Sequence, residues 1–428
     1  MGDSLGFHLL FIIFGVALPL LISGTELYGI VSHRPKVRAL ARTWSKALVV
    51  LFIVGAVSGT IISLQFNLVW PEFLKFINKP IGLAFALEGT AFWLETVFLS
   101  VYMLSWDRFK PLYHWLCGIP MVIGSVASAV FITTVNAFMN QPRGFVLGAD
   151  GQPTNIHTFQ AMFNPATFTE VTHSILGYVC ACALIIMAVY AWLYMKKRHA
   201  KDRAWMSKVI VALALIALVF GTATAFMGDR SAKYLARYEP YKLAAAEGLL
   251  QTQTHAPLVV GGVVVNGELK YAVKIPSLLS FLATNHFGAE VKGLNEYPLH
   301  ERPSLTVHYF FDGMVLSGIL IILFPGLFLL LVFLKKRSWA FSRPMLAALV
   351  ACAAFGVLAT EFGWMLTELG RQPWIVHGYL TVADAMTTNP RVIQIGLLFP
   401  CFYIVLLGLS VYILRKTMNH QAVHNVDA

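Results

Sequence analysis

The chain has 428 residues, of which 57% are hydrophobic and only 12% are charged. A mean hydropathy of +0.69 lies far above that of a soluble domain and indicates a polytopic membrane protein. The formal net charge of +11 is better explained by basic loops on the cytoplasmic face of a membrane than by nucleic-acid binding. The five cysteines lie in apolar runs without C-x-x-C or C-x-x-C-H spacing, which argues against disulfides, zinc ribbons and covalently attached c-type haem.

Nine apolar stretches are long enough to cross a bilayer, which takes about 20 helical residues. They are residues 7–31, 46–70, 81–105, 112–139, 169–195, 206–227, 305–334, 344–369 and 391–414. We therefore predict an all-α polytopic membrane protein with about nine transmembrane helices. The first stretch lacks a basic leader and can span by itself, so we expect no cleavable signal peptide.

Basic residues alternate between the two sides of the predicted helices. Most of the 32 Lys and Arg lie in the loops after the first, third, fifth and seventh stretches and in the C-terminal tail. The positive-inside rule then places the N-terminus outside and the C-terminus in the cytoplasm. Helices in 1–227 and 305–428, the latter with a short cytoplasmic tail, would flank an outer polar segment at 228–304. In that segment, alternation over Pro257–Val265 and a turn at Asn266-Gly267 into Tyr271–Ile275 predict a β-hairpin.

Polar side chains inside the predicted helices share one depth. With this topology His8, His173, Met314 and Glu368 all fall in the outer layer of the membrane. A His and a thioether on opposite faces of iron give a closed electron-transfer haem, whereas a single protein ligand leaves a position open for oxygen. The alternative stays open for each residue taken alone, because a membrane His often bonds a neighbouring helix and a membrane Met usually packs.

Two pairs of carboxylates also lie within apolar helices. Glu88 and Glu95 are seven residues apart, as are Glu361 and Glu368, and this spacing puts each pair on one helix face about 10 Å apart. Buried carboxylates in such a row are typical of a proton relay or an ion path. Ion pairs with Lys or Arg of neighbouring helices are the alternative.

The motifs together resemble subunit I of the cytochrome bd-type quinol oxidases along nearly the whole chain. The most specific match is Glu368 followed by Gly370-Arg371-Gln372-Pro373-Trp374. The others are Phe7-His8 in the first helix, Glu88-Gly with Trp93-Leu-Glu95 in the third, Trp106-Asp107-Arg108, Asn136 to Pro142, Asn164-Pro165 before Thr172-His173, and Glu239-Pro-Tyr-Lys242 to Glu247.

The resemblance implies a role for each matched residue. His173 and Met314 would be the axial pair of the low-spin b haem, and His8 and Glu368 would bind the two haems of the oxygen-reducing pair. The other matched residues would act in quinol oxidation (Lys242, Glu247), in proton delivery (Glu88, Glu95) and within the cofactor-binding motif (Arg371, Gln372, Trp374), with Arg371 neutralising a haem propionate or Glu368.

The resemblance also implies cofactors and partners. They are two b haems and a third haem of type d or b, membrane quinol as substrate, subunit II as a heterodimer partner, and room for a small accessory subunit, in a multi-pass protein of the bacterial cytoplasmic (inner) membrane that binds no nucleic acid. The short outer loop matches members that include cyanide-tolerant types. Asp312 stands where the family often has Arg, which should change the potential of the low-spin haem.

The function predicted from these residues is that of a respiratory quinol:oxygen oxidoreductase. Quinol would be oxidised at the outer face and oxygen reduced with protons from the cytoplasm, which is electrogenic. One rival is a proton- or cation-coupled transporter that uses Glu88, Glu95, Glu361 and Glu368. Another is a non-enzymatic haem electron carrier, which would need His173 and Met314 but neither an open haem nor a quinol loop.

Overall fold

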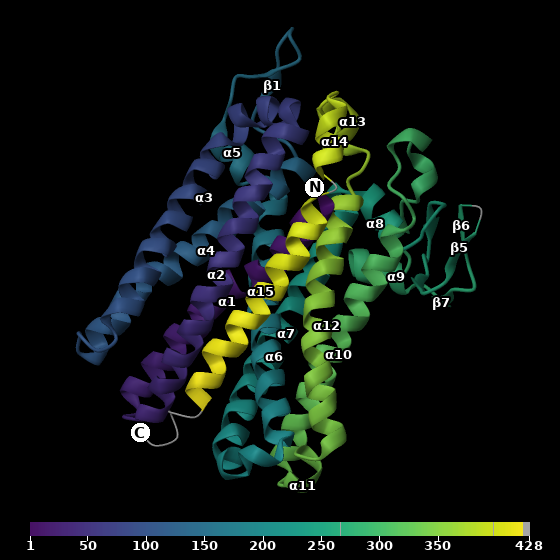
Figure 1. The fold of residues 1–428 in the computed structure, drawn as a ribbon. Coiled ribbons are helices and arrows are strands. Elements are labelled where there is room, and N and C mark those ends of the chain that lie inside the picture. Colours follow the sequence, from purple (N-terminus) through teal and green to yellow (C-terminus); the bar gives the residue numbers. More distant parts are fainter. Residues whose placement is uncertain (266, 397, 423–428) are drawn as a thin grey trace. The chain divides into compact units, whose positions relative to one another are not determined.

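The computed structural model describes residues 1–265, 267–396 and 398–422. Within these residues nine helices are long and apolar enough to cross a membrane, which confirms the predicted fold class (Figure 1). They are α1 (Gly2–Val31), α2 (Pro35–Val69), α3 (Pro71–Ser105), α4 (Pro111–Asn140), α6 (Pro165–Met195), α7 (Arg203–Tyr238), α10 (Val307–Phe333), α12 (Arg343–Leu369) and α15 (Leu398–Ala422). Which side of the membrane each terminus occupies stays a prediction.

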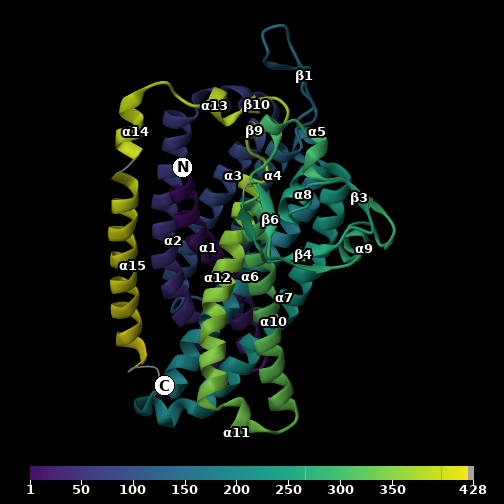
Figure 2. The same ribbon diagram turned by 90° about the vertical axis from the view of Figure 1, so that its right-hand side faces the viewer.

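The chain divides into two compact units. The first comprises residues 1–138, 143–164 and the segment from Ala385 onward, and the second comprises residues 139–142 and 165–384. Besides its long helices, the first unit contains β1 (Val146–Leu147), β2 (Pro153–Thr154), α5 (Thr158–Met162) and α14 (Pro390–Gly396). In this unit α1 packs along α2, and Figure 2 shows α15 running beside α2.

Helices α3 and α4 approach each other backbone to backbone. A Cβ added at Gly124 of α4 would lie 2.7 Å from the carbonyl oxygen of Ala91 and 2.8 Å from the amide nitrogen of Glu95. Small residues allow such close approach in membranes, where packing and hydrogen bonds hold helices together. The absence of a side chain at Gly124 therefore sets where α4 lies against Glu95.

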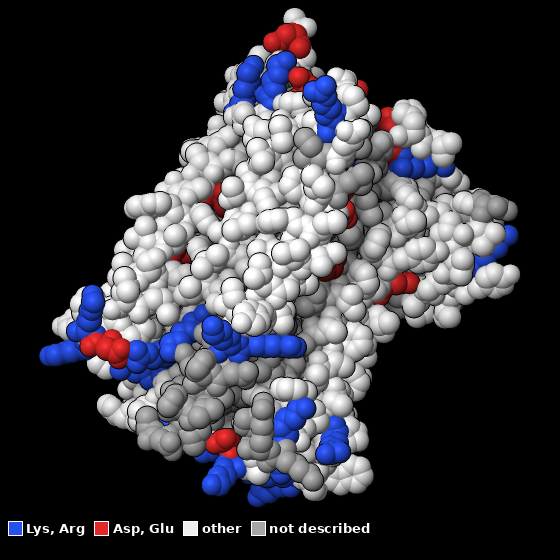
Figure 3. Space-filling model, in the orientation of Figure 1, with Lys and Arg blue, Asp and Glu red and all other residues white. Residues whose placement is uncertain are grey.

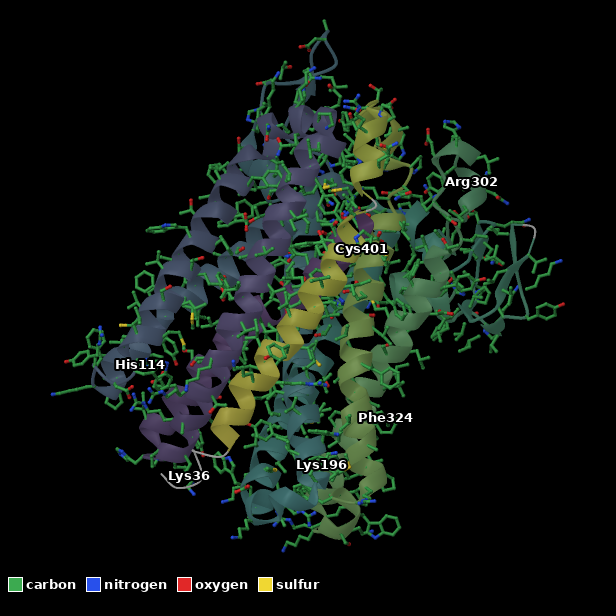
Figure 4. The ribbon with its side chains drawn as sticks, viewed as in Figure 1. Lys36, His114, Lys196, Arg302, Phe324 and Cys401 are labelled. Atoms are coloured by element: carbon green, nitrogen blue, oxygen red, sulfur yellow. The ribbon has the colours of Figure 1, made fainter. Side chains whose placement is uncertain are left out.

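A buried carboxylate joins the four helices α1–α4 near one end of the first unit. Glu26 is fully buried, and its oxygens lie 2.7 Å from His114 Nδ1, 2.7 Å from the Tyr102 hydroxyl, which donates to it, and 3.4 Å from Arg38 Nε. Figure 4 shows His114 at the start of α4. Removing one partner of a buried ion pair costs about 3–5 kcal/mol, so this cluster is a strong tie between the helices.

The second unit is built on a bundle of α6, α7, α10 and α12. Small residues again lie at the crossings, because a Cβ added at Gly356 of α12 would lie 3.3 Å from the Cα of Ala181 on α6. The face of α10 and α12 seen in Figure 3 carries no Lys or Arg between the helix ends, whereas basic residues gather around α11 (Arg337–Ala340). This distribution suits helices that cross an apolar layer.

The segment between α7 and α10, residues 239–306, is here called the loop segment. Helix α7 continues to Tyr238, beyond the end of its predicted apolar stretch at 227, because the polar residues there still favour helix. The loop segment contains α8 (Pro240–Ala246), β3 (Gln253–Thr254), β4 (Leu258–Val260), β5 (Val263–Val265), β6 (Glu268–Lys270), β7 (Val273–Ile275), α9 (Leu278–Thr284), β8 (Glu290–Val291) and short 3-10 turns at Leu294–Glu296 and Leu299–Glu301.

The predicted hairpin is present, with a different division into strands. Strand β5 pairs with β6, and β4 pairs with β7, both antiparallel. The strands are interrupted at Gly261-Gly262 and at Tyr271, where the backbone adopts positive φ angles. The predicted turn residue Asn266 lies outside the described residues, and Gly267 has φ +79°, as a tight hairpin turn requires.

Beyond α12 the second unit ends in a small hairpin, in which β9 (Trp374–Val376) pairs with β10 (Leu380–Thr381). The short helix α13 (Val382–Ala385) follows and leads back into the first unit.

The Gly124 contact predicts a measurable loss of stability. Gly124→Ala should lower the melting temperature of the detergent-solubilised protein, because overpacking against rigid backbone costs about 1–3 kcal/mol. Gly89→Ala on α3 is the matched control, since a Cβ there meets nothing within 4 Å, and it should leave the melting temperature unchanged or raise it. Equal melting temperatures for the two variants would contradict the close approach.

Candidate functional site

His173 lies in the bundle of the second unit with a free ring nitrogen. It belongs to α6 and faces Gly228 of α7, where an added Cβ would lie 3.5 Å from its Cε1 atom. Its Nδ1 atom is buried and has no hydrogen-bond partner among the described residues. Leaving a buried polar atom without a hydrogen-bond partner destabilises the fold by about 1–3 kcal/mol. A bound group that accepts the lone pair of this nitrogen, such as a haem iron, would remove that cost.

Met314 lies in the same bundle, on α10, and also faces a glycine. A Cβ added at Gly363 of α12 would lie 3.2 Å from the Met314 sulfur. The bundle thus offers an imidazole nitrogen and a thioether, each beside a position without a side chain. These two kinds of donor fit a haem held between a His and a Met.

Glu368 is paired with Arg371 at the end of α12. Arg371 NH2 donates to Glu368 Oε2 at 2.6 Å. Arg371 is 2% exposed, and its Nε and NH1 atoms have no partner among the described residues. The structure thus brings Arg371 and Glu368 together, and the remaining buried donors of Arg371 suit a second anion such as a carboxylate. Gln372 is exposed, and Trp374 is half-buried at the start of β9.

The Gly-Arg-Gln-Pro-Trp motif lies against Lys242 of α8. A Cβ added at Gly370 would come within 2.8 Å of Lys242 Cγ. The Lys242 ammonium is buried and donates to Asn140 Oδ1 at 2.6 Å, and it forms an ion pair with Glu239 Oε2 at 2.5 Å. The Tyr234 hydroxyl donates to the other Glu239 oxygen at 2.9 Å. The Lys242 charge is therefore compensated inside the protein.

Sequence reasoning assigned no role to two residues near Lys242. Asn140 bonds Lys242 and also donates to Glu170 Oε1 at 3.3 Å, so it links α4 to α6. Glu170 lies inside a predicted span, so it could have been found by the same criterion as Glu88, a carboxylate within an apolar helix. For Asn140 the only indication in the sequence is its place in the motif at 136–142.

A Tyr–His ring pair also lies beside this cluster. The ring centroids of Tyr241 and His377 are 4.4 Å apart. Burial lowers the pKa of His377 to about 4 and raises the pKa of Tyr241, so His377 is neutral near pH 7. The backbone nitrogen of His377 donates to Met139 O at 3.0 Å. No periodicity or motif in the sequence indicated this pairing.

Glu247 and Lys242 have different neighbours, as expected because residues five apart on a helix do not share a face. It follows the last residue of α8 and is 3% exposed, and its Oε2 atom has no partner among the described residues. Burial, and then the charge of Asp312, raise the pKa of Glu247 to about 8. Glu247 is therefore largely protonated near neutral pH and able to exchange a proton.

His308 and Asp312 hold the loop segment to α10. His308 Nδ1 lies 2.7 Å from the carbonyl oxygen of Ala246, and its Nε2 lies 3.0 Å from that of Gly261. Asp312 accepts a hydrogen bond from the Gly261 backbone at 2.6 Å. This bond gives the acid at position 312 a structural role in this chain. The predicted effect of Asp312 on a haem potential stays a prediction.

The first unit carries the remaining predicted residues. His8 Nδ1 lies 2.8 Å from the Ser58 hydroxyl, and its ring faces Gly59, where an added Cβ would be 3.0 Å from Cε1. Ser128 donates to Glu88 at 3.0 Å. Glu95 is 4% exposed, and its Oε1 has no partner among the described residues. The structure thus places Glu88 and Glu95 along one face of α3, against α4.

Comparisons with known proteins agree with one another. The sequence model of the family described as cytochrome bd terminal oxidase subunit I matches residues 1–422. A Bacillus subtilis (strain 168) protein provisionally named cytochrome bd menaquinol oxidase subunit I is 36% identical over 96% of this chain and 94% of its own length. Cytochrome bd-II ubiquinol oxidase subunit 1 of Escherichia coli (strain K12) is 26% identical over 96% of this chain and 93% of its own length. The solved bd oxidase of Geobacillus thermodenitrificans matches with a TM-score of 0.92 and 39% identity over 98% of this chain and 96% of that one.

The raised pKa of Glu247 predicts how stability depends on pH. An unfolded Glu releases its proton near pH 4.3, whereas the folded protein keeps it up to about pH 8. Stability should therefore fall as pH rises from about 4.3 to about 8, by up to roughly 1.4 kcal/mol per pH unit. Glu247→Gln should flatten this part of the profile in thermal unfolding at pH 5–8. The exposed Glu290→Gln serves as the control, and a Glu247→Gln profile parallel to wild type would refute the assignment.

Proposed function

We propose, from the premise that this chain belongs to the cytochrome bd terminal oxidase subunit I family, that its two units hold the haem ligands and that quinol reacts beside α8. The single observation that carries the proposal is His173, whose buried Nδ1 has no described partner and which shares its bundle with Met314.

Family membership fixes the coarse function. The protein is the haem-bearing subunit of a respiratory quinol oxidase, a multi-pass protein of the bacterial inner membrane that works with subunit II. Membership of a quinol oxidase family argues against the two rival functions, the transporter and the non-enzymatic electron carrier. Relatives named for menaquinol and for ubiquinol both match, so quinol-dependent oxygen uptake should be measured with each of the two quinols.

The proposed ligand set follows the geometry of each unit. His173 and Met314 would hold a low-spin b haem, because a His–Met pair closes both axial positions. His8 and Glu368 would each bind iron on one side and belong to the oxygen-reducing pair, which consists of a b haem and a third haem of type d or b. The bound haems supply electron transfer and oxygen binding. Arg371, with two buried donors left over, would pair with a propionate.

Quinol oxidation releases two protons and two electrons for each quinol. The ionised form of Glu247 is proposed to take a proton, because a general base works best with a pKa near the working pH and its pKa is about 8. This form is the minor one near neutral pH and its fraction increases toward pH 8. Lys242 is proposed to position this site rather than to react, since Asn140 and Glu239 already engage its ammonium. Protons leaving from Glu247 would reach the outer face if the predicted orientation holds.

Oxygen reduction needs protons from the other side of the membrane. Glu88, bonded to Ser128, and Glu95, whose Oε1 has no partner among the described residues, are proposed to pass them along α3. Buried carboxylates stacked on one face suit such a relay. The enzyme would then be electrogenic without a pump. We extend the proposal to a small accessory subunit, which co-purification with the tagged complex would reveal.

Reduced-minus-oxidised spectra of purified complexes test the haem assignment. His173→Ala should abolish the low-spin b signal. His8→Ala should abolish oxygen uptake with that signal intact, because the two residues would bind different haems. His300→Ala, an exposed histidine of the loop segment, is the control and should change neither. A low-spin signal that survives in His173→Ala would overturn the ligand assignment, and a far-red band in wild type would identify haem d.

Quinol oxidation can be tested separately. Glu247→Gln should lower kcat for quinol-dependent oxygen uptake by about 10²–10⁴-fold, the usual contribution of a general base. Haem content and reduction by dithionite should stay unchanged. The exposed Glu290→Gln is again the matched control. Full turnover in Glu247→Gln across pH 6–9 would exclude Glu247 as the proton acceptor.

A further inference from the structure

The hairpin of residues 258–275, made of strands β4 to β7, exposes apolar side chains. Its exposed large apolar residues are Val260 (45% exposed), Val263 (54%), Tyr271 (89%), Val273 (65%) and Ile275 (42%). Val260 stands opposite Val273, and Leu258 opposite Ile275, across the β4–β7 ladder. Opposite residues of an antiparallel pair point to the same side, so Leu258, Val260, Val273 and Ile275 form one apolar face of the β4–β7 ladder. Val263 lies in the neighbouring β5–β6 ladder, opposite Lys270.

This hairpin lies beside the first two turns of a membrane span. The Tyr309 hydroxyl is 2.7 Å from the backbone nitrogen of Val264, which donates to it, and Asp312 accepts from Gly261. Tyr309 and Asp312 belong to the first two turns of α10, a helix of membrane-spanning length and composition. Figure 1 shows β5, β6 and β7 alongside the upper part of α10.

The other paired strands of the loop segment have a different surface. Strands β3 and β8 expose Gln253, Thr254 and Glu290, as expected for strands in water. A row of exposed valines on short strands in water would invite aggregation. The hairpin also carries exposed Lys270, Lys274 and Tyr271. Lysine and tyrosine are the residues that lie at the boundary between lipid chains and water, with the apolar part of the side chain inside and the polar end outside.

We propose that the hairpin is a lipid-contact surface, which lies in the interface of the host bilayer with its valine face toward the acyl chains. Lys270 and Lys274 bind the phosphates of anionic headgroups, and Tyr271 anchors the turn between β6 and β7. The inference requires only that α10 spans the membrane, and it does not depend on which residues bind haem or quinol. Because His308 ties Gly261 to Ala246, the lipid contact also steadies the end of α8 that precedes Glu247.

Site-directed spin labelling of the whole complex tests the proposal. Val273→Cys and Tyr271→Cys are made with Cys401→Ser, which removes the exposed cysteine of the described chain. The matched control is Leu299→Cys, which is 80% exposed in the same loop segment but outside the hairpin. Each complex is labelled with a nitroxide and placed in nanodiscs that contain phosphatidylglycerol.

The measurement compares relaxation of the nitroxide by oxygen, which concentrates in lipid, with relaxation by a water-soluble nickel chelate. A complex with Cys401→Ser alone corrects for labelling elsewhere, and retained oxygen uptake shows that each variant is folded.

The two reagents separate the possible surroundings. The proposal predicts an oxygen-to-nickel accessibility ratio several-fold higher at positions 271 and 273 than at 299. Equal ratios at the three positions would mean that the hairpin lies in water and would overturn it. Low accessibility of positions 271 and 273 to both reagents would mean that another protein surface covers the hairpin, and would overturn it as well.

Discussion

A carboxylate enclosed among apolar helices must be compensated by a cation, a hydrogen-bond donor or its own proton. The arrangement of this protein depends on how each such group is compensated. Glu26 is bonded by His114 and Tyr102 and lies near Arg38, and so ties together α1–α4. Glu239 binds Lys242, and Glu368 binds Arg371. These pairs are structural ties, because leaving either partner alone would expose a buried charge to a medium that cannot solvate it.

A second group of carboxylates keeps an oxygen without a partner among the described residues. It consists of Glu95 on α3, Glu361 on α12 and Glu247 after α8. A proton relay requires acid groups inside the protein that are not already held by an ion pair. Glu247 combines this state with a place in the loop segment, directly after α8. Glu26, Glu239 and Glu368 are thus structural ties, whereas Glu95 and Glu247, together with Glu88 beside Ser128, are the acids proposed to handle protons.

Positions without side chains complete the arrangement. Gly228 and Gly363 let the His173 ring and the Met314 sulfur lie close to the backbones of α7 and α12, and Gly370 lets the Lys242 stem lie against the motif after α12. Each glycine allows a functional side chain and a neighbouring backbone to approach within van der Waals distance. His308 is bonded to Ala246 and to Gly261, and Asp312 accepts from Gly261, so the end of α8 and the proposed lipid-contact hairpin are both tied to α10.

The sequence by itself determined the nine spans, because apolar runs of bilayer length are a local property that no tertiary contact can reverse. It also determined the intramembrane acids, the ligand-type residues and the family motifs, since residue type and spacing along one helix are visible in one dimension. Only the tertiary structure decided that Lys242 is neutralised by Asn140 and Glu239, that Tyr241 lies against His377, and that Asp312 holds Gly261. These contacts join residues far apart in the chain, and hydropathy carries no information about which polar atoms meet. The continuation of α7 to Tyr238 and the breaks in the hairpin at Gly261 and Tyr271 were likewise set by backbone geometry and packing, which a periodic pattern averages away.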